Sequence, residues 1–233
     1  MLGSKGLLRR GMAGLADHQH EFERGPEETA RWNVTDRERI GLLDVVKHVR
    51  PTVLVGTTGV AGSFSEEAVR ALAAGNARPV VFMLSNPTAN AECTPDEALR
   101  WTEGRALLAT GSPFQDVAFQ GRRVPVAQAN NVFIFPGVGL GAIVSRAHRV
   151  TDLMFLAAAK ALAECVPDSS IREGRVLPPI GEVRRAAVAV AFAVAREAGR
   201  AGLGDAPDEP GLSRRIAAAM WNPEYLPYRL PPR

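Results

Sequence analysis

The chain has 233 residues, enough for one large domain or two small ones. Its 46% hydrophobic and 23% charged residues are typical of a globular protein, and its net charge of +3 is too small and too evenly spread to indicate binding to nucleic acid or to a membrane. Cys93 and Cys165 are far apart and read as packing residues, and the N-terminus lacks a signal-peptide core, so we expect a cytoplasmic protein.

Residues 1–37 are polar, rich in glycine and arginine and only weakly periodic, so we expect them to form a polar N-terminal segment. A helix is predicted from Arg37 to the proline at position 51, because apolar residues recur there at the spacing of one helix face. These apolar residues are Ile40, Leu43, Val46 and Val49.

Apolar runs alternate with amphipathic runs as far as residue 136. We predict strands at 52–56, 79–85, 105–111 and 130–137, and helices at 63–76 and 94–104. In the first of these helices, Ser63 and Glu66 have the spacing of a capping box. In the second, Thr94 and Glu97 have that spacing and Pro95 stands at the first helical position.

Strands that are apolar throughout and alternate with helices indicate βαβ units in a parallel sheet covered on both faces. We therefore expect an α/β fold with a doubly wound, Rossmann-like parallel sheet in residues 38–136. Residues 137–221 are expected to be helical, and residues 222–233 form a proline-rich tail. Within the helical part, the individual helical patterns cover 140–150, 151–165, 182–199 and 212–221.

Polar, uncharged loops follow or adjoin the predicted strands, at the edge where open parallel sheets bind ligands. They are GTTGVAG (56–62), SNPT (85–88), TGSPF (110–114) and QANN (128–131). The glycines of GTTG allow close backbone approach, and the next helix N-terminus favours negative charge. Asn86 precedes a proline and is held extended, so its amide is either a turn device or a ligand contact. Each loop alone is more often plain loop geometry, but four at one edge favour a cofactor face.

A glycine motif at 137–142 (GVGLGA) matches the dinucleotide fingerprint, but its context does not fit. Pro136 stands at the turn, and no acidic residue closes a second strand about 20 positions later, as ribose recognition requires. We expect these small residues to let a helix pack closely against the sheet. The sequence therefore has no convincing phosphate-binding first βαβ unit.

Catalytic constellations are hard to find among the polar side chains. Asp17, His18 and His20 could form a metal cluster, but a solvated polar loop is several times more common, and His48 and His148 read as surface positions on helices. Serine and threonine residues at the strand ends have no obvious base partner, so an activated nucleophile is not supported.

Three long motifs follow one another in the order 52–73 (TVLVGTTGVAGSFSEEAVRALA), 79–114 (PVVFMLSNPTANAECTPDEALRWTEGRALLATGSPF) and 128–143 (QANNVFIFPGVGLGAI). Together they resemble the cofactor-binding domain of malic enzymes, with the closest likeness to the bacterial NAD-linked, oxaloacetate-decarboxylating type. The similarity runs from Gly6 to Tyr228 and includes a W-x-x-E-Y motif at 221–225.

The resemblance implies oxidation of (S)-malate at C2 by hydride transfer to NAD, then decarboxylation to pyruvate with Mg²⁺ or Mn²⁺, in a dimer or tetramer. When the motifs are matched one by one, three asparagines would contact malate. Two of them, Asn86 and Asn130, would also contact the nicotinamide side of the cofactor. The GTTG loop would lie against the dinucleotide. The implied substrate residues are Asn86, Asn130 and Asn131, and the implied cofactor residues are Gly56, Thr57, Thr58, Gly59, Asn86 and Asn130.

The sequence also departs from the family pattern. The catalytic tyrosine and lysine, the acidic metal ligands and the glycine-rich loop of the first βαβ unit are not among these residues, so we expect a sheet that lacks this unit. Gly3 stands where family members carry an aspartate that binds the adenosine ribose. Gln19 and His20 stand near the position, shortly before Phe22, at which NADP-linked relatives tend to have a lysine, which favours NAD.

Two functions remain open at this point. The chain is either part of an NAD-dependent malic enzyme, as a fragment without its own catalytic groups, or a non-catalytic nucleotide-binding or oligomer-forming module derived from that domain. An unrelated small-molecule enzyme on a doubly wound sheet is disfavoured by the run of motifs. Because strands would be absent from one edge of the sheet, we expect the chain to self-associate and to bind NAD weakly.

Overall fold

The computed structural model describes residues 1–34, 36–205 and 207–225. The chain forms two compact units, which are described separately. Unit 1 consists of Met1–Ala129 and Asp168–Leu177, and unit 2 consists of Asn130–Pro167 and the residues from Pro178 onward. Most of the predicted tail, residues 226–233, lies outside the described residues.

Unit 1 is built on a four-stranded parallel sheet with the order β3-β4-β5-β8. Its strands are β3 (Val53–Gly56), β4 (Val80–Met83), β5 (Leu107–Thr110) and β8 (Ala127–Gln128). The first three strands pair in phase, so that Val53, Val80 and Leu107 lie side by side. The prediction of an α/β fold with a parallel sheet is confirmed.

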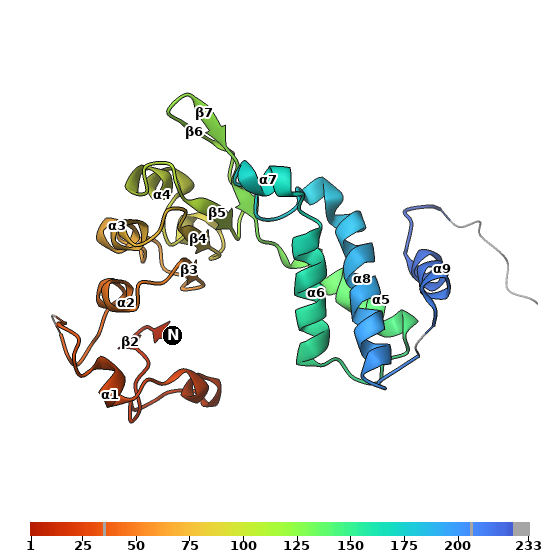
Figure 1. The fold of residues 1–233 in the computed structure, drawn as a ribbon, viewed down its shortest axis with the longest axis horizontal. Coiled ribbons are helices and arrows are strands. Elements are labelled where there is room, and N and C mark those ends of the chain that lie inside the picture. The colour runs from red at the N-terminus through yellow and green to blue at the C-terminus, as the bar shows by residue number, and fades with distance from the viewer. Residues whose placement is uncertain (35, 206, 226–233) are drawn as a thin grey trace, which may run out of the picture. The chain divides into compact units, whose positions relative to one another are not determined.

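Three helices of unit 1 lie in a row on one side of this sheet (Figure 1). They are α2 (Leu42–Val49), α3 (Glu66–Ala74) and α4 (Pro95–Trp101). The strands step in one direction across the sheet, and right-handed crossovers that all step the same way place their helices on the same face. The chain order thus places α3 and α4, the helices of these crossovers, on one face, and α2, which precedes β3, lies beside α3.

The apolar strands predicted that helices would cover both faces of the sheet, but β3 is covered on only one face. Leu54 is buried in the core under the helices, whereas Val53 and Val55 on the opposite face are 45% and 53% exposed. An apolar run is consistent with burial on both faces but does not require it. Strand β3 is an edge strand with one apolar face open.

The fourth predicted strand, 130–137, is wrong. The sheet instead continues with β8, which ends two residues before that stretch begins, and the apolar run VFIF leads through η3 (Asn131–Phe133) into helix α5 (Phe135–Val144). Asn130 caps η3 through its Oδ1, which accepts a hydrogen bond from the Val132 amide at 2.9 Å. Pro136 lies in the first turn of α5, where its fixed backbone favours a helix.

A short hairpin that the sequence did not predict precedes β8. It consists of β6 (Val117–Phe119) and β7 (Arg122–Val124), paired antiparallel. Gln120 and Gly121 form its two-residue loop, and both have positive φ, as a tight hairpin turn requires.

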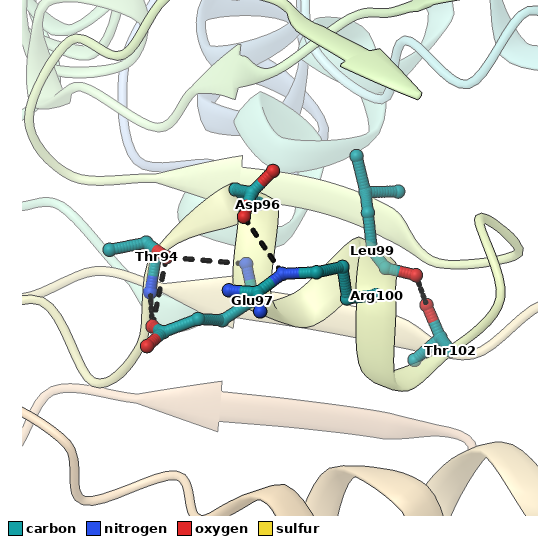
Figure 2. A network of polar contacts seen from close by, with 6 residues as sticks. All are labelled: Thr94, Asp96, Glu97, Leu99, Arg100 and Thr102. Carbon is teal, nitrogen blue, oxygen red and sulfur yellow. Dashed lines mark hydrogen bonds and ion pairs between the residues drawn. The ribbon is translucent and has the colours of Figure 1, made fainter. Parts of the chain in front are cut away.

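The ends of the helices in unit 1 follow local sequence signals, with two corrections. Helix α2 begins at Leu42 rather than at residue 37, and the cap of α3 is Ser65, which accepts from the Ala68 amide, rather than Ser63. Helix α4 matches its prediction (Figure 2): Thr94 and Glu97 form a reciprocal capping box, and Pro95 stands in the first turn.

The N-terminal segment is folded onto α2. It contains the antiparallel pair β1 (Leu2–Gly3) and β2 (Gly6–Leu7), η1 (Asp17–Phe22) and α1 (Pro26–Thr29). The ring of Trp32 stacks on His48 with centroids 5.0 Å apart, and His48 Nε2 accepts a hydrogen bond from the Asn33 amide. His48 therefore attaches the N-terminal segment to α2 and is only partly exposed, whereas His148 is exposed as predicted.

Unit 2 is helical, as the sequence predicted. Its helices are α5, α6 (Asp152–Glu164), α8 (Val183–Arg200) and α9 (Glu209–Ala219), with the short η4 (Ile180–Glu182) before α8. The short α7 (Asp168–Arg172) and the 3-10 turn η2 (Thr88–Asn90) belong to unit 1. Among the described residues, no helix has the length and hydropathy needed to cross a bilayer.

The GVGLGA motif does provide close packing, but against a helix and not against the sheet. A β-carbon on Gly137 would lie 2.6 Å from Val190, and one on Gly141 would lie 2.7 Å from the Ala191 carbonyl oxygen, both on α8. Gly139 faces open space. Helices α5 and α8 can therefore approach each other only because the side chains are absent at these positions.

Candidate functional site

The carboxyl ends of β3, β4 and β5 lie together at one end of the sheet, where three of the polar loops identified from the sequence meet. The loop after β3 runs through residues 57–62, which are all exposed to solvent. The loop after β4 contains Ser85 and Asn86, and the loop after β5 contains Gly111 and Ser112. The structure thus brings together the strand-end loops of unit 1.

A buried carboxylate, Glu92, ties the first two of these loops together. Its side chain is fully buried, and Oε1 accepts hydrogen bonds from the Thr58 amide at 2.8 Å, from the Thr58 hydroxyl at 3.0 Å and from the Ser85 hydroxyl. Oε2 accepts from the Ser85 amide at 3.4 Å. The Ser85 hydroxyl oxygen in turn accepts from the Gly59 amide at 2.8 Å. One side chain therefore fixes both loops.

Glu92 is ionised despite its burial. Burial by itself raises the pKa of Glu92, because removal from water disfavours the charged form. The hydrogen bonds from Ser85 and Thr58 stabilise the carboxylate and outweigh that effect, so the pKa of Glu92 lies below its ordinary value. A negative charge is consequently held directly beneath the loop after β3.

Gly56 makes room for this carboxylate. A β-carbon at Gly56 would lie 2.5 Å from Glu92 and 2.7 Å from the ring of Phe64. Gly56 is buried, whereas Thr57, Thr58 and Gly59 are exposed. The four residues implied as cofactor contacts thus divide into one that permits the buried network and three that form its outer surface.

Three amides of the loop after β3 are already bonded within the protein, which weakens the expectation that this loop favours a negatively charged group. The amides of Thr58, Gly59 and Val60 are bonded to Glu92, to Ser85 and to the Thr58 hydroxyl oxygen. The helix that follows begins several residues later and carries Glu66 and Glu67 in its first turn, which satisfy its positive end. These three amides therefore do not form a cradle for an anion.

Asn86 connects the ends of β4 and β5. Its Oδ1 accepts a hydrogen bond from the Ser112 hydroxyl at 2.5 Å, and its own backbone oxygen accepts from the Asn90 side chain at 3.3 Å. A β-carbon on Gly111 would overlap the Leu84 carbonyl oxygen, so the ends of β4 and β5 can approach this closely only because residue 111 is a glycine. The Asn86–Pro87 peptide is cis, and Asn86 itself is exposed.

The other two asparagines implied by the resemblance lie in unit 2. Asn130 caps η3, as described above, and Asn131 is exposed in the first turn of that helix. Both stand at the start of unit 2, directly after β8 in the chain. Their roles, like that of Asn86, stay predictions.

In the part of the chain that the structure describes, these loops are accompanied neither by a reactive thiol nor by a cluster of metal ligands. Burial raises the pKa of the Cys93 thiol to about 12, and its Sγ packs 3.3 Å from the sulfur of Met83, so it is a packing residue, as predicted. Cys165 is also buried. Over residues 1–34, 36–205 and 207–225, no three histidine, cysteine or carboxylate side chains are placed to hold a metal ion.

Sequence reasoning missed Glu92, the most heavily bonded polar residue at this edge. It lies in the stretch ANAECTP, between the SNPT loop and α4, and looks like a loop glutamate. A local signal did exist, because Ala91 and Cys93 on either side are small or apolar, as is usual in a buried segment. Its partners Thr58 and Ser85 are distant in sequence, so only the fold reveals the network.

The chain is similar to known proteins over most of its length. Residues 1–199 match the family model described as the malic enzyme NAD-binding domain. Over 229 residues, or 98% of the chain, it is 44% identical to an NAD-dependent malic enzyme of Pseudomonas aeruginosa and 42% identical to one of Aliivibrio fischeri. The chain spans about 41% of the length of these relatives.

Solved structures with a similar fold include two malic enzymes. The enzyme from Pyrococcus horikoshii aligns over 87% of this chain and 42% of its own with a TM-score of 0.62 at 25% identity. The enzyme from Entamoeba histolytica aligns over 93% of this chain and 42% of its own with a TM-score of 0.66 at 23% identity, which supports the fold alone. The matched family model covers most of the sequence, and so the chain belongs to the malic enzyme NAD-binding domain family.

Proposed function

We propose that the chain is the NAD-binding part of a malic enzyme that converts (S)-malate to pyruvate and CO₂. NAD would supply the hydride acceptor for oxidation at C2 of malate. The observation that carries the proposal is the Glu92 network. It fixes two loops at the carboxyl ends of the strands, where parallel sheets bind cofactors, in a chain of the matching family.

The chemistry of this edge fits the uncharged part of a dinucleotide better than its phosphates. The loop after β3 presents exposed glycine, threonine and valine, three of its amides are already bonded, and Glu92 places a negative charge behind it. We infer that Thr57, Thr58 and Gly59 contact the nicotinamide–ribose portion of NAD, and that the buried Gly56 acts by admitting Glu92. The network supports a rigid, neutral contact surface.

The asparagines would position the reactants. The Ser112 hydroxyl occupies Oδ1 of Asn86, which orients the exposed amide with its N–H groups available to accepting oxygens of malate or the ribose. Asn131 would contact malate and Asn130 both malate and the nicotinamide ribose. All three carry no charge, which suits a site whose charge balance comes from a metal and a lysine.

The remaining groups of the reaction would come from sequence outside these 233 residues. The described residues do not fit Mg²⁺ or Mn²⁺, since they contain no suitable cluster of ligands. We also infer that the sheet is the later part of a doubly wound, Rossmann-like sheet without its first βαβ unit, since β3 lies at its edge with an open apolar face.

A direct assay tests this proposal. The purified chain is mixed with malate, NAD and Mn²⁺ and NADH formation is followed, and NADH binding is measured separately by fluorescence. We expect weak NADH binding and no turnover by the chain alone. Turnover above that of a Thr58→Arg variant would show that the catalytic groups lie within the chain, and no binding at any concentration would contradict the cofactor role.

A non-catalytic nucleotide-binding or oligomer-forming module is the second candidate, favoured by the open apolar face of β3. Val53 and Val55 are exposed on an edge strand, where unpaired backbone groups can pair with another copy. Complete relatives would form dimers or tetramers. Sedimentation velocity of the purified chain distinguishes a defined oligomer from concentration-dependent association, and a monodisperse monomer would rule out the oligomer-forming module.

A further inference from the structure

Unit 1 has a basic cavity at the end of its sheet opposite to the Glu92 network. Its lining residues lie immediately before β4, β5 and β8, at the amino ends of these strands, and in the β6–β7 hairpin and the segment after α7. The cavity has a volume of about 570 Å³, within the range of about 300–1,000 Å³ found for small-molecule sites. Parallel sheets bind cofactors at the carboxyl ends of their strands, so this cavity is separate from the proposed cofactor face.

Arginines dominate the lining of this cavity. Six arginines face one aspartate and one glutamate, and the rest of the lining is mostly small or aliphatic. The arginines are Arg78, Arg105, Arg122, Arg123, Arg172 and Arg175, and the acidic residues are Asp116 and Glu173. Four separate stretches of the chain thus contribute positively charged side chains to the lining of this cavity.

Three of the guanidinium groups are held in place by backbone carbonyls. Arg105 Nη1 donates to the Asn76 oxygen at 2.6 Å, Arg122 Nη2 donates to the Gly104 oxygen at 2.6 Å, and Arg78 Nη2 donates to the Ile171 oxygen at 3.2 Å. Each of these bonds uses one terminal nitrogen, and a guanidinium carries five N–H groups. The remaining N–H groups of these positioned side chains are available to a ligand.

The acidic residues do little to neutralise this charge. Asp116 lies 3.6 Å from Arg123 and also accepts a hydrogen bond from the Val126 amide. Among the residues that the structure describes, no carboxylate lies within ion-pair distance of the other five arginines. Arg172 and Arg175 flank Gly174 in sequence, and a β-carbon on Gly174 would lie 3.8 Å from Leu107 and from Pro125, so this segment passes close to the strands that border the cavity.

We propose that this cavity binds a small anion with two or more phosphate or carboxylate groups, at a site distinct from the cofactor face. Arginine is the residue best suited to such ligands, because its planar fork donates two parallel hydrogen bonds to one oxyanion. The lining includes no aromatic side chain on which a large ring could stack, which favours a compact polyanion.

The test uses the full chain with pyrophosphate and citrate as probes, measured by titration calorimetry and by thermal unfolding at constant ionic strength. Pyrophosphate binding with little response to citrate identifies a phosphate site, and the reverse identifies a carboxylate site. The double variant Arg172→Gln/Arg175→Gln should weaken binding of the effective probe by about tenfold or more, since hydrogen bonds between charged groups are the strong ones. The matched double variant Arg70→Gln/Arg100→Gln removes the same charge elsewhere on unit 1 and should bind normally.

A gain of affinity provides a check that misfolding cannot imitate. Asp116→Asn removes the negative charge beside the cavity, and the amide oxygen can still accept from the Val126 amide, so the probe should bind several-fold more tightly. The proposal is overturned if neither probe has an effect beyond that of sodium chloride, if both double variants weaken binding equally, or if Asp116→Asn leaves the affinity unchanged.

Discussion

Replacement of the buried carboxylate by an amide, Glu92→Gln, probes the centre of the proposed cofactor face. Glutamine has the same shape and can accept, through Oε1, the three hydrogen bonds that now reach Oε1 of Glu92 from Thr58 and Ser85. Its NH₂ group would then face the Ser85 amide, which now donates to Oε2 at 3.4 Å. One acceptor is lost and the other three bonds lose their charge assistance.

The expected loss of stability follows from these contacts. Hydrogen bonds to a charged group are worth about 1.5–3 kcal/mol and neutral ones about 0.5–1.5 kcal/mol, so three such bonds lose about 3 kcal/mol in total. Relief from burying a charge offsets part of this, which leaves about 2 kcal/mol. With a urea m-value of about 2 kcal/mol/M, the unfolding midpoint should fall by about 1 M.

Urea unfolding followed by circular dichroism measures this change, with Glu103→Gln as the control. Glu103 is exposed in the same unit, so its change should stay within about 0.5 kcal/mol. The difference between wild type and Glu92→Gln should also depend on pH. Because the folded-state pKa of Glu92 is lowered, its contribution is complete above the pKa of an exposed glutamate, about 4.3, and is lost as the pH falls through the lower folded-state value. Equal midpoints at neutral pH, or a difference that does not shrink in acid, would refute the role given to Glu92.

Other changes test the remaining features. Gly141→Ala should cost about 1–3 kcal/mol because its β-carbon would strike a backbone oxygen of α8, whereas Gly139→Ala, which meets open space, should be neutral or slightly stabilising in thermal unfolding. Thr94→Ala should cost about 1 kcal/mol by removing the cap of α4, which urea unfolding detects; no change would mean that the cap is redundant. Val55→Lys should reduce self-association in sedimentation velocity, and an unchanged distribution would point to a different contact surface. In a complete relative, the change equivalent to Asn86→Ala should lower turnover more than melting temperature, and the opposite result would make the Asn86–Ser112 bond purely structural.

Features that depend on neighbours in sequence could be predicted well. Helix α4 has its cap, its proline and its acidic third residue within four positions, and it forms as those signals indicate. The parallel strands β4 and β5 were recognised as apolar runs between helices. Motifs of this length also sufficed to recognise the family, because many residues had to agree in order.

Features that depend on partners distant in the chain could not be read in this way. The run VFIF fits a strand or a buried helix equally well, and the cap at Asn130 together with its packing in unit 2 determines that it becomes helical. The glycines of the GVGLGA motif signalled close packing, but their partner, α8, is about fifty residues away.

Glu92 shows the same distinction at the candidate site. Its sequence neighbourhood marks it as an ordinary loop glutamate, while Thr58 and Ser85 look like exposed loop residues. Parallel pairing of β3 with β4 brings both loops over the same point, and the carboxylate is stable there only because four donors converge on it. The amino acids alone identify the family and the polar loops, and the convergence of hydrogen bonds from separate strands shows how those loops are held.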